Sequence, residues 1–270
     1  MSNLLSILLV LVCGGSLVGL LSGLFGIGGA LIIVPLLNIL FTHMGIPESM
    51  VQHLAVGTAP STMLVTCFTT FLAHARMGSM SWEAWKKMTP GIVAGSICGA
   101  LLAHVIDGRT LETLFGVIIV IMGIQMLVGF TPKPHAFMKK LYVPVSLFIG
   151  MLASMTGVAG SLQLIIFLAW AGYAWCDCVG TSAALTLPIT LTSTISYMIV
   201  GWNAPSLPEY SLGYVYLPGT LALMIPGMIM AVVGAKLAHW SNLPTGLLKR
   251  GFALFGIGVG ISILCRTLGA

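Results

Sequence analysis

The sequence predicts an all-α polytopic membrane protein built from two inverted repeats. Hydrophobic residues make up 58% of the 270-residue chain and charged residues only 6%, whereas a soluble domain carries about 25% charged residues. Several apolar runs reach the ~20 residues that a helix needs to cross a bilayer, among them 111–129 and 214–235. A chain this apolar cannot cover its surface with polar groups, so we expect lipid to be its main solvent.

Ten hydrophobic elements are expected, five in each half, and the second element of each half is short. They lie near 4–24, 30–44, 50–73, 89–106 and 111–129, and then near 142–157, 161–174, 178–200, 214–235 and 247–265. No Lys or Arg precedes Arg76. The first element therefore lacks the basic start of a secretory signal, and we expect it to be a retained membrane segment.

Three matches between the halves, in the same order, indicate a duplication. Gly19–Gly29 matches Gly150–Gly160, Val56-Gly57-Thr58 matches Val179-Gly180-Thr181, and Gly99–His104 matches Gly234–His239. Internal repeats of this kind are typical of transporters. We expect a first transmembrane repeat at 1–130, a cytoplasmic linker at 131–141 and a second transmembrane repeat at 142–270.

The distribution of charge predicts that the two repeats are inverted. Loop 74–88 carries three basic residues and its counterpart 201–213 none, whereas loop 107–110 carries one and its counterpart 236–250 three. Because Lys and Arg collect in cytoplasmic loops, nine basic residues fall inside and two, Arg109 and Arg266, outside. Both termini are then outside. Inversion requires an odd number of crossings per half, so either all five elements cross or the first two form a re-entrant pair.

Each short second element follows a glycine-rich break, Gly26-Ile27-Gly28-Gly29 in the first half and Gly157-Val158-Ala159-Gly160 in the second. Broken backbone at membrane depth is tolerated only where protein or a wet cavity satisfies it. A helix that begins there points unpaired N–H groups at the cavity and can bind an anion. The alternative is that the glycines only permit close helix packing. The candidate substrate-binding glycines are Gly26, Gly28, Gly29, Gly157 and Gly160.

Polar side chains near the breaks are further candidates for substrate contact. The hydroxyls of Thr58, Thr181 and Ser182, near the starts of the third elements, and the amide of Gln163 could donate to a substrate oxygen. Alternatively they bond within their own helix or join helices. His53 is the ionisable group within the third element of the first half. It could attract an anion and couple proton movement, or it could be a neutral histidine bonded to a backbone carbonyl.

Several segments resemble the sulfite exporter TauE/SafE family over essentially the whole chain. They are Gly19–Leu36, which reads GLLSGLFGIGGALIIVPL, then His53–Thr58, Arg76–Trp82, Pro90-Gly91 and Gly99-Ala100. The resemblance implies a bacterial-type multi-pass permease of the inner membrane for sulfur-containing anions such as sulfite or organosulfonates. The second half departs from this pattern, because Ala159 and Ile166 stand where the first half has Gly28 and Pro35.

The sequence therefore predicts a cell-membrane transporter of small sulfur-containing anions, working by alternating access and directed to export. A passive anion channel, or a permease for another small organic anion, is the alternative. An enzyme is not expected, because the chain lacks paired carboxylates and HExxH spacing. We expect no cofactor, no metal and no nucleic-acid partner. The expected partners are the anion and the lipid bilayer, and the sequence leaves proton coupling and oligomerisation open.

Overall fold

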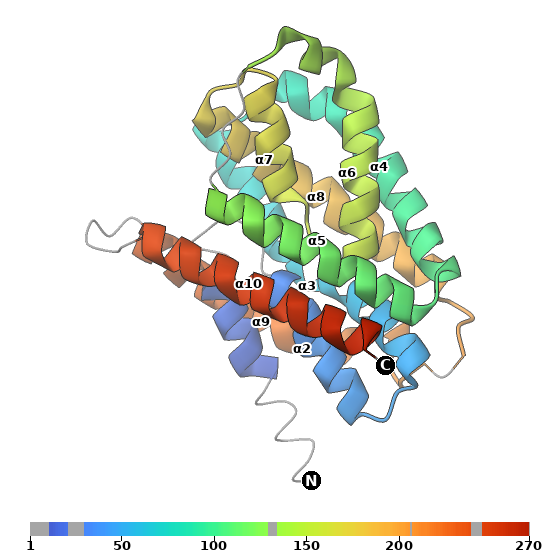
Figure 1. The fold of residues 1–270 in the computed structure, drawn as a ribbon. Coiled ribbons are helices and arrows are strands. Elements are labelled where there is room, and N and C mark those ends of the chain that lie inside the picture. Colours follow the sequence, from blue (N-terminus) through green and yellow to red (C-terminus); the bar gives the residue numbers. More distant parts are fainter. Residues whose placement is uncertain (1–10, 21–29, 129–133, 206, 239–244, 270) are drawn as a thin grey trace.

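The structure is a computed structural model that describes residues 11–20, 30–128, 134–205, 207–238 and 245–269. Within these ranges the chain forms a bundle of long, crossing helices (Figure 1). In chain order the elements are a helix at Leu11–Leu20, α2 (Ala30–His43), α3 (Glu48–Met77), α4 (Trp82–Val105), α5 (Gly108–Val128), a 3-10 turn η1 (Ala136–Leu141), α6 (Tyr142–Thr156), α7 (Ser161–Trp170), α8 (Trp175–Val200), β1 (Ser211–Leu212), β2 (Val215–Tyr216), α9 (Leu217–Ala238) and α10 (Thr245–Leu268).

The long helices have the length and the surface of membrane spans. Among the described residues, six helical stretches are apolar and long enough to cross a bilayer. Large aliphatic side chains remain exposed on them, including Ile121 on α5, Ile195 on α8 and Ile229 on α9. Water would oppose such a surface, whereas lipid accepts it. The chain is therefore an all-α, multi-pass membrane protein, as predicted.

The helices follow the predicted elements closely, with one clear exception. Most of loop 74–88 is helical, because α3 continues to Met77 and α4 already begins at Trp82. Gly78 ends α3 in the left-handed conformation, with φ at 66°. Ser81 then caps α4 by accepting a hydrogen bond of 3.3 Å from the backbone N–H of Ala84. Hydropathy missed this first turn of α4 because it is amphipathic and carries Glu83, Lys86 and Lys87.

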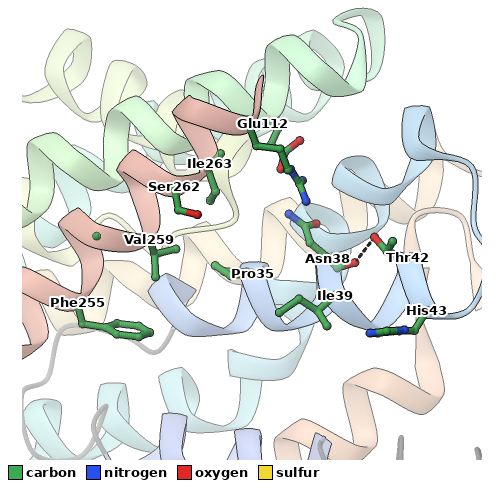
Figure 2. Close-up of a pocket in the computed structure, with 12 residues that line it drawn as sticks. Pro35, Asn38, Ile39, Thr42, His43, Glu112, Phe255, Val259, Ser262 and Ile263 are labelled. Atoms are coloured by element: carbon green, nitrogen blue, oxygen red, sulfur yellow. Dashed lines mark hydrogen bonds and ion pairs between the residues drawn. The ribbon is translucent and has the colours of Figure 1, made fainter. Parts of the chain in front are cut away.

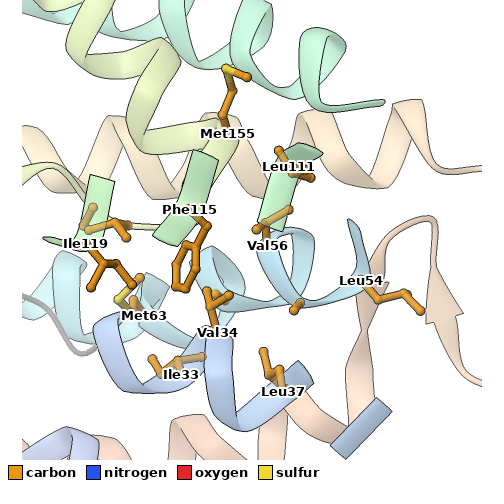
Figure 3. Close-up of a cluster of buried hydrophobic side chains, with 14 of the residues drawn as sticks. Ile33, Val34, Leu37, Leu54, Val56, Met63, Leu111, Phe115, Ile119 and Met155 are labelled. Atoms are coloured by element: carbon orange, nitrogen blue, oxygen red, sulfur yellow. The ribbon is translucent and has the colours of Figure 1, made fainter. Parts of the chain in front are cut away.

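One apolar core holds α2, α3 and α5 together. Figure 3 shows Val34 and Leu37 of α2 facing Val56 of α3 and Phe115 of α5, with Met155 at the end of α6 close by. These side chains are almost completely buried. A second cluster lies between α4, α6, α7 and α8 around Met88, Leu164 and Leu185.

Glycines set the closest helix contact in the bundle, between α4 and α6. Gly91, Gly95 and Gly99 recur every four residues along one face of α4, and each touches the backbone or a small side chain of α6. A Cβ on Gly95 would overlap the carbonyl oxygen of Leu147. Small residues at this spacing allow two membrane helices to approach closely, so α6 lies beside α4 along much of its length (Figure 1).

Contacts between loops define two ends of the bundle. At the end that we call the basic end, α3 and α7 finish and α4, α6 and α8 begin. The backbone N–H of His135 there donates to the carbonyl of Trp170 over 2.8 Å, and the Tyr142 and Tyr173 hydroxyls lie 2.6 Å apart. Since α6 starts and α7 finishes at this end, they form an antiparallel helix pair with the glycine break at its tip.

At the opposite end α2, α4, α8 and α10 finish and α3, α5 and α9 begin. Gly108, the first residue of α5, lies against the carbonyl of Ser49 in the first turn of α3. Arg109 donates from Nε and Nη2 to the carbonyl oxygen of Thr267, over 2.8 and 2.6 Å. Asp107 precedes α5, and its carboxylate accepts from the N–H and the hydroxyl of Thr110. These two bonds hold the pKa of Asp107 below its ordinary value.

Alanine at Gly95 should destabilise the protein by about 1–3 kcal/mol, the usual cost of overpacking, because α6 backbone occupies the space of the new methyl group. The matched control is Gly251→Ala in α10, where an added Cβ meets nothing within 4 Å and the better helix propensity of alanine should leave stability equal or slightly higher. Thermal unfolding in detergent measures both. Equal melting temperatures for the two variants would contradict the proposed packing role of Gly95.

Candidate functional site

The second glycine break is a buried turn between α6 and α7. Gly157 and Gly160 have φ values of 68° and 66°, in the left-handed region that glycine tolerates best. A Cβ on Gly157 would lie 3.2 Å from the Cα of Val56 in α3, and one on Gly160 would lie 3.2 Å from Ala153 in α6. The tip of the α6–α7 pair therefore rests on α3, and α7 begins with its first N–H groups inside the protein.

Two polar side chains flank this break. The Oε1 atom of Gln163, in the first turn of α7, is buried and accepts no hydrogen bond from the described residues. On the α6 side, the hydroxyl of Tyr197 donates to the carbonyl of Ser154 over 2.9 Å. The predicted first break, with Gly26, Gly28 and Gly29, lies outside the described residues, so its geometry stays a prediction.

Thr58 is engaged by the hairpin that joins α8 to α9. Its hydroxyl donates to the carbonyl of Tyr214 over 3.3 Å and accepts from the N–H of Tyr216 over 3.1 Å. Gly57 lies against the same loop, since a Cβ there would come within 2.6 Å of the Tyr214 oxygen. We call this contact the first anchor. It lies at the opposite end of the bundle and completes the hydrogen bonding of a loop that the sequence did not predict to contain strands.

Thr181 is engaged in the same way at the basic end. Its hydroxyl accepts a hydrogen bond of 2.8 Å from the N–H of Ser81, in the turn between α3 and α4. A Cβ on Gly180 would overlap the carbonyl oxygen of Ser79. We call this contact the second anchor. In both anchors, a Gly-Thr pair near the start of a long helix holds the loop that follows the other long helix.

The remaining predicted side chains are also satisfied by backbone. The hydroxyl of Ser182 donates to the carbonyl of Val179 over 2.9 Å, within its own helix. The two ring nitrogens of His53 lie 3.0 Å from the carbonyls of Ser49 and Ile106. A neutral imidazole donates to one of these carbonyls, whereas an imidazolium donates to both. His53 is buried near the start of α3, stacked 5.5 Å from the Tyr214 ring.

The predicted residues therefore form three groups rather than one site. Gly157, Gly160 and Gln163 lie at the tip of the α6–α7 pair, which rests on α3. Thr58 and His53 lie at the opposite end, on either side of Tyr214, and Thr181 and Ser182 lie at the basic end. Substrate contact by each of these residues remains a prediction. A substrate could contact the hydroxyl of Thr58 or Thr181 only if the loop bonded to that hydroxyl moved away.

A cavity that the sequence reading missed opens between α2, α5 and α10 at the opposite end. It encloses about 600 Å³ and adjoins a second hollow of about 390 Å³ that reaches the start of α3. Figure 2 shows Asn38 and Thr42 of α2 facing Glu112 of α5 and Ser262 of α10. Asn38, Thr42, Glu112 and Arg266 line both hollows. These residues come from three helices that are far apart in the sequence, α2, α5 and α10, so no sequence motif connects them.

The part of the chain that the structure describes contains no evident metal-binding cluster. No group of three or more His, Cys, Asp or Glu side chains comes together there. Cys178 is buried in the first turn of α8, while its neighbour Cys176 is exposed.

Comparisons with known proteins define the class of molecule. The family model of the sulfite exporter TauE/SafE matches residues 11–263. A "Probable membrane transporter protein" of Haemophilus influenzae is 32% identical over 258 residues, covering 93% of this chain and 96% of that protein. A similarly named protein of Methanocaldococcus jannaschii is 28% identical over 244 residues, covering 86% of this chain and 87% of its own. No solved structure matches the chain.

The helical fold and these relatives define a multi-pass membrane transporter. The chain belongs to the sulfite exporter TauE/SafE family, as the opening glycine signature predicted.

Replacing Thr58 by valine should lower stability by about 1–3 kcal/mol, because the isosteric side chain leaves the N–H of Tyr216 buried without an acceptor. Thr58→Ser keeps the hydroxyl and should keep most of the stability. Thr181→Val should act similarly through Ser81. Thermal unfolding in detergent provides the measurement, and a valine variant that melts like the serine variant would show that the hydroxyl does not hold the loop.

Proposed function

We propose that the protein is a secondary transporter that exports a small sulfur-containing anion, of the sulfite or organosulfonate class, by alternating access between two inverted repeats. The observation that carries this proposal is the pair of matched anchors. In the first anchor, α3 bonds the loop that follows α8. In the second anchor, α8 bonds the turn that follows α3. The two anchors lie at opposite ends of the bundle. Release of one anchor while the other holds would open one side only.

The helix contacts support a twofold relationship between the halves. α2 packs on α3 as α7 packs on α8, and α3 and α8 cross each other. α6 runs beside α4 through glycines, and the helix Leu11–Leu20 meets α9 in the same way, with Gly19 against Gly227. The re-entrant pair α6–α7 enters from the basic end. The helix Leu11–Leu20 and α2 start and finish toward the opposite end, as inversion requires.

The choice of an anion rests on the family and on the distribution of charge. Every Lys and Arg among the described residues lies in a loop or near a helix end. A substrate anion in mid-membrane would therefore meet helix N-termini and polar side chains, such as the start of α7 with Gln163. Each helix end supplies about half a charge, so two ends from two repeats would balance a monoanion. His53 offers a place where a proton could move with it.

The orientation follows from the same charges. Arg76, Lys86, Lys87, Lys139 and Lys140 gather at the basic end, whereas Arg109 and Arg266 lie at the opposite end with Glu48, Asp107 and Glu112. By the positive-inside tendency, the basic end lies on the cytoplasmic side of the cell membrane and both termini lie on the outer side.

Purified protein in liposomes tests the proposed activity. Labelled sulfite and short alkylsulfonates should enter faster when unlabelled anion is present inside, because counterflow requires a carrier that reorients. Gly160→Leu should abolish this uptake, since a branched side chain cannot enter the left-handed tip. Flux that follows the membrane potential without counterflow would instead establish a passive channel, and absence of anion flux would overturn the proposed function.

Single cysteines in a cysteine-free variant test the orientation. Asn203→Cys, in the exposed loop after α8, should react with an impermeant thiol reagent added to intact cells. Lys86→Cys, exposed at the basic end, should react only after the membrane is opened. Equal labelling of both positions from outside would contradict the inverted arrangement.

A further inference from the structure

The two adjoining hollows at the opposite end are lined by buried polar side chains that are not fully hydrogen-bonded: Asn38 lines both, and Gln52 lines the second. Nδ2 of Asn38 donates to Oε1 of Gln52 over 2.7 Å. Oδ1 of Asn38 and Nε2 of Gln52 then have no partner among the described residues, although the two side chains are only 7% and 2% exposed. Exchanging O and N in both amides would leave the same result, one free NH₂ group and one free carbonyl. Leaving such groups unpaired in a buried place costs free energy.

The bundle does not need this amide pair to pack α2 on α3. In the repeat alignment, the equivalent of Asn38 is Ala169 on α7, and the equivalent of Gln52 is Trp175 at the start of α8. α7 nevertheless packs on α8 as α2 packs on α3. The Asn38–Gln52 pair therefore occurs in one half only. Both side chains line the second hollow, in addition to lying between α2 and α3.

An ion pair at the mouth of the cavity provides the positive charge. Arg266 on α10 pairs with Glu112 on α5 through Nη2 and Oε1. The Glu112 side chain is 14% exposed, whereas that of Arg266 is 66% exposed, so the guanidinium keeps donors that face the opening. Arg109, the other arginine of this end, is committed to the carbonyl of Thr267. The remaining charged or titratable side chains that line the two hollows are His43, Glu48 and Asp107.

Apolar side chains line the cavity on both α2 and α10. They are Ile39 of α2 and Phe255 and Val259 of α10, and Figure 2 shows them on these two helices. A volume of about 600 Å³ lies in the range of pockets for small organic ligands. A bare inorganic oxyanion would fill only a small fraction of it.

We propose that this cavity binds an organic monoanion at the opposite end of the bundle. The anionic head takes donors from Arg266 and from the free amide of the Asn38–Gln52 pair, and an apolar body lies along Ile39, Val259 and Phe255. The proposal rests on the proposed anion transport and adds to it a recognition site remote from the glycine breaks. Glu112 competes with the ligand for Arg266, so the ion pair sets the affinity.

The test uses two variants of the one ion pair. Arg266→Gln should weaken the binding of hexanesulfonate about tenfold or more, the usual scale for a lost charge-assisted bond. Glu112→Gln should strengthen it, because the competing carboxylate is gone. Titration calorimetry of the full-length protein in a neutral detergent gives both affinities. If Arg266 and Glu112 only brace α5 against α10, both variants will shift the affinity in the same direction, and the proposal is overturned.

A third variant examines the apolar part without touching the charges. Ile39 is 56% exposed, so Ile39→Trp should fold normally while filling space on the α2 side of the cavity. It should weaken hexanesulfonate binding and leave methanesulfonate binding unchanged; equal effects on both would overturn the proposal. The control is Lys87→Gln, which breaks the exposed Lys87–Glu83 ion pair at the basic end and should change neither affinity.

Two further outcomes separate this site from its alternatives. In the first, the wild type and the variants Arg266→Gln, Glu112→Gln and Ile39→Trp all transport alkylsulfonates at the same rate. The proposed function would then stand, and the proposed binding site in the cavity would be rejected. Thermal stabilisation by added phosphatidylglycerol, with none from hexanesulfonate, would identify the occupant as a lipid headgroup and overturn the assignment to an organic substrate anion.

Discussion

The bundle depends on backbone meeting backbone where α3 and α8 begin. In a bilayer every peptide group must find a partner inside the protein, and the loop after α8 and the short turn after α3 both carry such groups. Gly57 and Gly180 remove the side chains that would keep the loops away, and Thr58 and Thr181 supply the hydroxyls that bond them. Once these loops are fixed, the positions from which α4 and α9 start are fixed as well.

Many hydroxyls in the middle of the bundle donate their hydrogen bond to a backbone carbonyl of their own helix. Thr62 donates to the carbonyl of Ala59, Thr186 to that of Ala183 and Thr194 to that of Thr190, each within its own helix. Such local bonds satisfy the side chain and leave little for a ligand. A smaller set of polar side chains differs, because each keeps a buried atom without a partner among the described residues: Asn38, Gln52, Gln125, Ser154, Gln163, Ser193 and Ser211. These unsatisfied atoms are therefore better pointers to ligand contact here than the number of Ser and Thr residues.

The sequence predicted the helices well because apolar runs about twenty residues long have few other uses. It also located the second glycine break, since Gly157 and Gly160 are required for their positive φ values. It did not predict that Thr58 and Thr181 bond loops from the other half, because a hydroxyl near a break looks the same in the sequence whether it faces a ligand or a loop. The hairpin at 211–216 escaped prediction, since strands of two residues have no periodicity to detect.

No Lys or Arg of the described ranges lies in the middle of a long helix, and this affects the energetics of the proposed transport cycle. A buried arginine would hold an anion tightly, because neither charge would have water to return to, and release would become slow. Partial charges from helix ends bind more weakly, and a pathway needs binding that is favourable enough to enter and weak enough to leave. Full charges then belong at the two ends, where water screens them and where they can collect the anion. The chain places its lysines and arginines in this way, with Arg266 held by Glu112 on one side and the cluster around Lys87 and Lys139 on the other.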